Sequence, residues 1–299
     1  MNSILVIGSS NTDMVIKTDR IPVPGETILG GRFFMNPGGK GANQAVAASR
    51  LGGKITFITK RGNDLFGNQT IGVLMNEGIN TEFIVKDPDL PSGVALITVD
   101  AGGENCIVVA PGANGSLLPS DIPDTVFSSE KHNILLLQLE IPVESVIYAS
   151  KKARENGLKV ILNPAPAQVL SDDLLENIWM ITPNETEAEI LTGIPISGTE
   201  NALKASDILI NRGVENVIIT LGEDGAWVKT EDFTGLVPGV KVKAVDTTAA
   251  GDVFNGALAV ALSEGMEIRE AVMFANKAAA LSVTKMGAQA SAPFRNEIA

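Results

Sequence analysis

The chain has 299 residues, of which 44% are hydrophobic, so it can bury a large core in one α/β domain or in two ordinary domains. Its 23 basic and 35 acidic residues give a net charge of -12, which excludes nucleic-acid binding by counterion release, so an anionic substrate must be held by a local site. The single Cys106 and the single His132 exclude an internal disulfide and a structural zinc site.

The N-terminal segment resembles neither a signal peptide nor a membrane anchor. It has no basic stretch, and the apolar run at 4–7 is too short for either purpose. No later stretch approaches the ~18 apolar residues that a membrane helix needs. A lone cysteine suits a reducing compartment, so we expect a cytoplasmic protein without nucleic-acid or membrane partners.

Short β-branched runs alternate with helical patterns along most of the chain. We expect buried strands at 4–7, 55–59, 134–139, 160–162, 179–182 and 217–221. We expect helices at 42–51, 68–77, 144–156, 185–191, 202–212, 252–263 and 268–285. This alternation predicts a mostly parallel sheet with helices on both faces, in which ligands bind at the carboxyl ends of the strands.

Two stretches, 14–35 and 93–111, break the alternation. Each has strand-like runs with turn residues between them and no helix, as in the turn at 100–105. These runs predict a small antiparallel sheet beside the main one, placed where it could act as a lid. No internal repeat, low-complexity tract or linker divides the chain. We therefore expect one α/β domain over 1–299 that carries a β lid formed by about 14–35 and 93–111.

The segment VDTTAAGDVFNGAL at 245–258 carries the most chemical information. Small residues before a helix let its unpaired N–H groups approach an anion closely, and the helix dipole favours negative charge there. Asp252 falls in the first turn and faces the same place. It could cap the helix, which is a common use of Asp, or act as a general base beside a phosphate. The local sequence leaves both interpretations open.

The segment NPGGKGANQA at 36–45 is a second glycine-rich helix entry. It lacks the spacing of a Walker phosphate-binding loop, because no Gly stands five residues before Gly39 and Gly41 replaces the Ser or Thr. It could be only a glycine turn. Alternatively, its glycines let a polyol lie against the backbone while Lys40 and Asn43 donate hydrogen bonds to it.

Polar residues follow several expected strands. GSSNTD at 8–13 and Glu140 could orient sugar hydroxyls, although each could equally be a turn or cap residue. TPNETEAE at 182–189 and TLGEDG at 220–225 could hold a nucleotide. Taken locally, the first is better explained as a helix entry with an acidic first turn and the second as a hairpin turn.

Together these segments resemble the ribokinase family within the PfkB-type carbohydrate kinases. The resemblance runs over nearly the whole chain and also includes PGET at 24–27, QLE at 138–140 and NPAPA at 163–167. It implies an α/β/α sandwich with a mostly parallel central sheet and a projecting β lid that forms a homodimer interface. It also implies transfer of the γ-phosphate of ATP to the 5-hydroxyl of ribose.

The resemblance assigns roles to individual residues. The sugar would be bound by Asn11, Asp13, Gly39, Lys40, Gly41, Asn43, Glu140 and Asp252. The nucleotide would be bound by Asn184, Thr220, Leu221, Gly222, Glu223, Asp224, Gly225, Gly251 and Asn276. Ala249, Ala250 and Gly251 would form an anion hole, and Asp252 would take the proton. Many relatives have Gly at the position of Ala249, but alanine still presents its N–H.

The resemblance also implies two metals. A monovalent cation, usually K⁺, would be bound near the anion hole, several of its ligands being backbone carbonyls, by Asp246, Thr248, Ser282, Lys285, Gly287 and Ser291. Mg²⁺ would arrive with ATP and be organised through water by 184–187.

Two other functions remain open. A related kinase for deoxyribose, fructose or a nucleoside would keep the AAGD segment and differ in its sugar contacts; GGKGAN together with Asp13 and Glu140 favours ribose. A non-enzymatic sugar or nucleotide sensor on the same fold would most simply have lost the base or the anion hole, and both are intact here.

Overall fold

The computed structural model describes residues 3–298 and is built around an eight-stranded sheet with the order β14-β13-β12-β11-β10-β9-β1-β4. Its strands are β1 Ser3–Ile7, β4 Lys54–Ile58, β9 Ile134–Leu137, β10 Lys159–Leu162, β11 Met180–Ile181, β12 Asn216–Thr220, β13 Gly225–Lys229 and β14 Thr234–Pro238. The six strands from β4 to β12 run parallel, and β13 and β14 are antiparallel additions at one edge. The predicted α/β class is confirmed.

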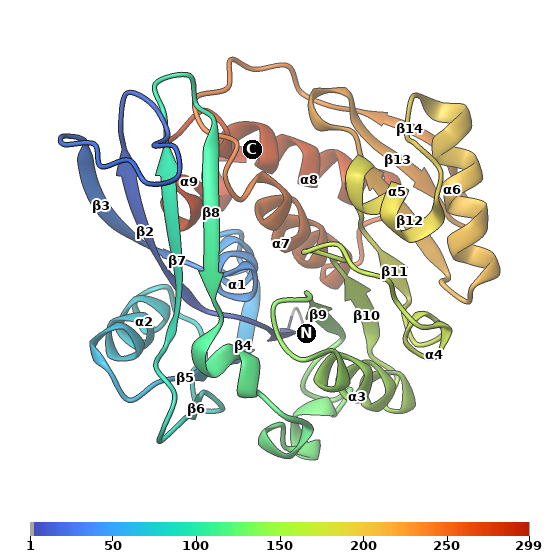
Figure 1. Ribbon diagram of the computed structural model, residues 1–299. Coiled ribbons are helices and arrows are strands. Elements are labelled where there is room, and N and C mark those ends of the chain that lie inside the picture. The colour runs from blue at the N-terminus through green and yellow to red at the C-terminus, as the bar shows by residue number, and fades with distance from the viewer. Residues whose placement is uncertain (1–2, 299) are drawn as a thin grey trace.

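Helices cover both faces of this sheet, as the ribbon shows (Figure 1). Alternate residues of β1 point to opposite faces: Ile4 and Val6 pack in the core with α1, α7 and α8, while Leu5 and Ile7 pack in the core with α3, α4, α5 and α6. The helices are α1 Lys40–Arg50, α2 Leu65–Asn76, α3 Val143–Glu155, α4 Asp172–Leu175, α5 Glu185–Thr192, α6 Thr199–Asn211, α7 Ala250–Ser263, α8 Ile268–Ser282, α9 Ala288–Ser291 and α10 Arg295–Ile298. The molecule is thus a three-layer α/β/α sandwich.

A second sheet of four strands stands beside the sandwich (Figure 1). Its order is β3-β2-β7-β8, with β2 Asn11–Lys17, β3 Arg32–Gly38, β7 Gly93–Val99 and β8 Asn105–Ala110. The two hairpins are antiparallel as expected, but their contact, β2 with β7, is parallel. The prediction that the small sheet is wholly antiparallel was therefore wrong. β3 returns the chain to the sandwich after β2, and β7 leaves the sandwich again in the direction of β2 after α1, β4 and α2.

Element boundaries differ modestly from expectation. The main helices begin one to three residues earlier than predicted, except α5 and α8; at α2 the side chain of Asp64 caps the added turn. The one-turn helices α4, α9 and α10 and the short pair β5 Lys60–Arg61 and β6 Val85–Lys86 were not expected. None of the helices within residues 3–298 is both long and apolar enough to span a bilayer.

The strand order reverses direction at β1, which fixes where a ligand can bind. The chain passes from β1 to β4 on one side, and β9 lies on the other. In such sheets the crevice outside the carboxyl ends of the strands at the reversal is the ligand site. The segments at that position are 8–10 after β1, 138–140 after β9, and the start of α1.

Candidate active site

The start of α7 presents free backbone donors. Ala249 precedes the helix in the left-handed conformation, with φ 60° and ψ 14°, which is costly for a residue with a side chain. The N–H of Ala250 is bonded to the carbonyl of Thr247 at 3.2 Å. The N–H groups of Ala249, Gly251 and Asp252 have no acceptor within residues 3–298. They are available to an anion, whose charge the helix dipole favours.

The carboxylate of Asp252 does not cap this helix. It is buried and accepts a hydrogen bond from Asn43 Nδ2 on Oδ2 at 2.9 Å and one from Gln44 Nε2 on Oδ1 at 3.0 Å. Burial raises the pKa of Asp252, and the Lys40 ammonium and the two amide donors offset only part of this effect. The capping interpretation of Asp252 therefore has no hydrogen bond to support it, whereas a buried carboxylate with a raised pKa suits proton transfer.

Three more residues expected to contact the sugar gather around Asp252. Glu140 Oε2 accepts from Ser9 Oγ at 2.5 Å and from the backbone N–H of Lys40 at 3.0 Å. Burial raises the pKa of Asp13 to about 6, with help from the Glu140 and Asp252 carboxylates. Burial opposes the ammonium of Lys40, but the surrounding carboxylates outweigh it, so the pKa of Lys40 is raised. The charges in this cluster thus influence one another's pKa values.

Two asparagines of the expected sugar site differ in availability. The Oδ1 of Asn43 is buried and has no hydrogen-bond partner within the described part of the chain, so it is free to accept from a ligand hydroxyl. The Oδ1 of Asn11 instead accepts from Asn114 Nδ2 at 2.8 Å. That bond ties the start of β2 to the segment that follows β8, so Asn11 has a structural task at the base of the small sheet.

Gly39, which precedes α1, and Gly41, in its first turn, have a packing role beyond the contact with a polyol that the sequence suggested. A Cβ at Gly39 would lie 2.7 Å from the backbone N of Asn11, and a Cβ at Gly41 would lie 2.7 Å from the backbone of Gly8 and Ser9. Only glycine allows the start of α1 to approach the end of β1 this closely. The glycines thereby bring Lys40 and Asn43 to the crevice.

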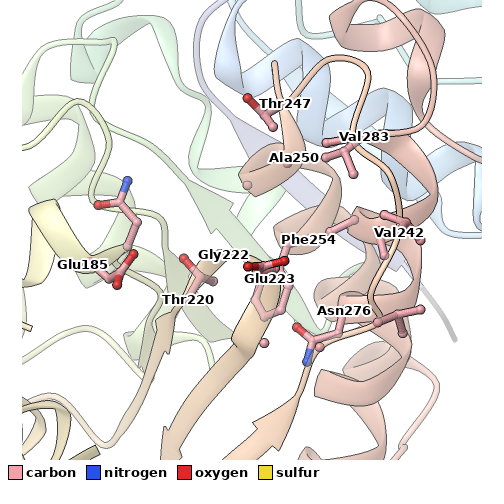
Figure 2. Close-up of a pocket in the computed structure, with 18 of the residues that line it drawn as sticks. Glu185, Thr220, Gly222, Glu223, Val242, Thr247, Ala250, Phe254, Asn276 and Val283 are labelled. Carbon is pink, nitrogen blue, oxygen red and sulfur yellow. The ribbon is translucent and has the colours of Figure 1, made fainter. Parts of the chain in front are cut away.

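A cavity of about 470 Å³ lies on one side of the α7 start (Figure 2). In that view Thr247 and Ala250 lie at the top, Glu185 and Thr220 on the left, and Asn276 on the lower right. Of the residues expected to bind the nucleotide, the lining includes Asn184, Thr220, Gly222, Glu223, Gly225, Gly251 and Asn276. Leu221 and Asp224 do not line it; Leu221 packs against the core beneath.

The local interpretations of the two nucleotide segments also hold. Asn184 caps α5 through a capping box with Glu187, since each side chain accepts from the other's backbone N–H. The segment 220–225 forms the turn between the antiparallel strands β12 and β13. These residues therefore have a structural task and line the cavity as well. The opposite wall includes Val240, Val242 and Ala244, whose irregular segment carried no motif to identify it.

A second cavity of about 600 Å³ lies between the small sheet and the segments 244–248 and 286–290. Asp13 lines it, and Thr247 lines both cavities. The start of α7 lines the first cavity, which reaches the expected nucleotide residues, and the segment 247–248 just before it lines the second, which reaches Asp13 of the expected sugar site. Such an arrangement suits the transfer of a group from one ligand to the other.

The residues expected around a monovalent cation are only partly brought together. Asp246 accepts from the N–H of Thr248 at 3.0 Å and from the N–H of Gly287 at 2.9 Å, and these bonds outweigh burial and lower its pKa. The Nζ of Lys285 is bonded to Glu297, so only its backbone could face a cation. The hydroxyls of Ser282 and Ser291 donate to carbonyls of their own helices. An oxygen-only donor set of this kind fits a hard cation.

Comparisons with known proteins agree with this geometry. The sequence profile of the pfkB family carbohydrate kinases matches residues 1–295. The chain is 45% identical to a ribokinase of Haemophilus influenzae, over 99% of this chain and 96% of that protein. It is 41% identical to a deoxyribokinase of Salmonella typhi, over 97% of this chain and 95% of that protein.

Solved structures show the same fold. The structure of Arabidopsis thaliana ribokinase complexed with ribose and ATP is similar with a TM-score of 0.91 and 32% identity, over 99% of this chain and 97% of that one. The match extends over both the sandwich and the small sheet. This chain belongs to the pfkB family of carbohydrate kinases.

Proposed function

We propose that this protein is a ribokinase, which transfers the γ-phosphoryl group of ATP to the 5-hydroxyl of D-ribose and releases ribose 5-phosphate and ADP. The observation that carries the proposal is Asp252, a buried carboxylate with a raised pKa, which follows free helix N–H donors at the wall of the first cavity. The full-length similarity to a ribokinase supports the choice of ribose.

In the proposed step Asp252 takes the proton of the 5-hydroxyl. The electron pair of that O–H bond forms the new bond to the γ-phosphorus, and the bond between phosphorus and the leaving oxygen breaks with its electrons on ADP. The N–H groups of Ala249 and Gly251 stabilise the negative charge on the transferred group. The other side chains position the sugar: Asp13 and Glu140 accept from its hydroxyls, and Asn43 offers its free Oδ1.

Metal ions enter the proposal in two places. Mg²⁺ would come with the phosphates of ATP and neutralise their charge, and the segment 184–187 would hold it through water; no cluster of three or more His, Cys, Asp or Glu side chains able to hold a metal exists within 3–298. K⁺ would be held by Asp246 and the carbonyls of 282–291, and would shape the anion hole indirectly. Initial rates of desalted enzyme in KCl and in NaCl test this; equal rates would exclude a functional K⁺ site.

The small sheet is proposed to be both a lid and a homodimer interface on a single α/β domain over 1–299. One face of the sheet carries Asp13 and Val15 toward the second cavity. The side chains of the other face are apolar and exposed: Ile16, Phe33, Met35, Leu96 and Val108. An apolar face of this extent is expected to be covered, and a second copy would cover it with the same residues.

The experiment that tests the function is a substrate panel. We would measure kcat/KM with ATP for ribose, 2-deoxyribose and fructose, and locate the phosphate on the product by NMR. Ribose should be preferred over 2-deoxyribose by roughly 10- to 150-fold, because a carboxylate left without its hydroxyl partner loses a strong hydrogen bond.

Deoxyribose is the second candidate, because a deoxyribokinase is also similar over the full chain. A wild type that prefers 2-deoxyribose would replace ribose by deoxyribose and leave the mechanism standing. A wild type that phosphorylates neither sugar would overturn the proposed function.

A further inference from the structure

We propose that Gln44 and Gln138, here called the amide pair, are positioning residues that fix which lone pairs of Asp252 face the sugar. Gln44 touches Asp252 directly, and Gln138 acts only through Gln44. The inference rests on the proposed function, because it concerns the proton transfer to Asp252. It gives a role to two buried side chains that are not among the residues expected to bind the sugar or the nucleotide.

Every hydrogen of the Gln44 amide is used. Its Nε2 donates to Asp252 Oδ1 at 3.0 Å and to Asn163 Oδ1 at 3.0 Å. Gln44 is fully buried, as is Gln138. Because Gln44 occupies Oδ1 and Asn43 donates to Oδ2, the carboxylate is held on both sides and cannot rotate without losing a charged hydrogen bond.

Gln138 selects the orientation of the Gln44 amide. Its Nε2 donates to Gln44 Oε1 at 2.6 Å. If Gln44 turned its amide over, its oxygen would face the carboxylate of Asp252 and its nitrogen would face the nitrogen of Gln138, so both contacts would become repulsive. Gly8 leaves the room for this arrangement, since a Cβ there would collide with Gln138 Oε1.

The amide pair acts within a charged surrounding. The groups that face Asp252 are Lys40 at the start of α1, Glu140 after β9, Asp13 in β2 and Glu187 in α5. Three of them are carboxylates, which oppose the ionised form of Asp252. An amide that donates to the ionised form and not to the protonated one works in the opposite direction. Removal of the Gln44 amide should therefore raise the pKa of Asp252, so that activity is lost at a higher pH.

The test uses Gln44→Met, Gln138→Met and the double variant, which keep side-chain volume and remove the amides. We expect Gln44→Met to lower kcat roughly 10- to 100-fold and to move the acid limb of the kcat–pH profile up by about one pH unit, as for one lost hydrogen bond to a charged group. Gln138→Met should do the same to a smaller extent. The double variant should be no worse than Gln44→Met, because Gln138 has no other route to Asp252.

One control variant separates positioning from folding. Asn216 is another buried amide, which donates to the carbonyl of Trp179 at 2.9 Å away from the cavities. Asn216→Leu should lower the urea midpoint and leave the pH limb in place. The profiles are measured with whichever sugar of the panel the wild type phosphorylates best, so a wrong choice of sugar does not affect the test.

The outcomes are distinct. An unshifted acid limb together with an unchanged kcat in Gln44→Met would overturn the inference. So would effects of the two single variants that multiply in the double variant. In either case an inactive Asp252→Asn would still support Asp252 as the base. Full turnover by Asp252→Asn would overturn the proposed mechanism and, with it, the role of the amide pair.

Discussion

At the residue scale, Gly251 is a position where one added methyl group should impair activity without impairing folding. A Cβ built on Gly251 meets no atom within 4 Å, so the protein itself leaves this space empty. The residue lines the first cavity beside N–H donors that have no acceptor within 3–298. A substituent there should meet only the bound phosphate.

We predict that Gly251→Ala lowers kcat at least ~10-fold and leaves thermal stability unchanged or higher, because Ala is the better helix former by about 1 kcal/mol. Gly72→Ala is a matched control: Gly72 lies in α2, and a Cβ there also meets nothing within 4 Å. Its kinetics should equal those of the wild type. Normal turnover by Gly251→Ala would show that phosphate does not approach this residue.

Asp13 supplies a second prediction, on pH. Its pKa is raised to about 6 by burial and nearby carboxylates, and in the proposed site it accepts strong hydrogen bonds from two sugar hydroxyls only when ionised. The KM for ribose should therefore rise by up to about tenfold for each pH unit below 6, with kcat less affected. Asp13→Asn should bind ribose more weakly and should show a flatter KM profile. A wild-type KM that stays constant from pH 5 to 7 would contradict the assignment.

The raised pKa of Asp13 also makes the free energy of unfolding depend on pH. The pKa of Asp13 lies above the ordinary value of 3.8 for an aspartate, so between about pH 4 and 6 the folded state keeps a proton that the unfolded state has lost. Stability should then fall as pH rises from about 4 to about 6 and stay level above that window. In Asp13→Asn this loss should be absent, and at neutral pH the loss in the wild type amounts to about 3 kcal/mol in the free energy of unfolding.

At the scale of elements, the contact between α1 and α7 sets the distance from the amides to the base. A Cβ at Gly256 of α7 would lie 2.8 Å from the carbonyl oxygen of Gln44 and 2.9 Å from Cβ of Ala47. Glycine thus allows the helices to approach until Asn43 and Gln44 reach Asp252.

We predict that Gly256→Ala separates these helices, destabilises the protein by about 1–3 kcal/mol and lowers kcat, because overpacking at a helix contact shifts the backbone. Urea unfolding and steady-state kinetics measure the two effects. If Gly256→Ala loses stability but keeps the wild-type kcat, the distance between α1 and α7 does not control the base.

The sequence predicts the elements better than their contacts. The β-branched runs predicted the strands that became β1, β4, β9, β10, β11 and β12, because fully buried strands need continuous apolar residues. The β2–β7 pairing could not be predicted, since nothing in either hairpin specifies a partner more than 70 residues away in the chain.

In the candidate site, too, the sequence predicted individual residues better than the contacts between them. Motif strings placed Asp13, Asn43 and Asp252, which the fold brings together. Gln44 stood inside NPGGKGANQA and Gln138 inside QLE, yet neither was singled out, because their contact with each other appears only after β9 and α1 pack. The packing task of Gly39 and Gly41 was missed for the same reason.

At the scale of the whole molecule, the apolar outer face of the small sheet predicts a dimer. Leu96 is 55% exposed and Val108 is 63% exposed, and the two are paired across β7 and β8. We predict that Leu96→Glu/Val108→Glu shifts the protein from dimer to monomer in analytical ultracentrifugation, because buried carboxylates without partners oppose association. Val169→Glu, at another exposed apolar residue, should remain dimeric. A wild type that is monomeric at high micromolar concentration would exclude this interface.

The central claim is that Asp252 accepts the proton of the sugar hydroxyl, and turnover by Asp252→Asn tests it most directly. The amide keeps the size of the side chain and removes the base. With ribose and ATP saturating, kcat should fall at least ~10²-fold, the usual range for a lost general base, while calorimetric binding of both substrates is nearly unchanged. Turnover within a few-fold of the wild type, with both substrates still bound, would contradict the account.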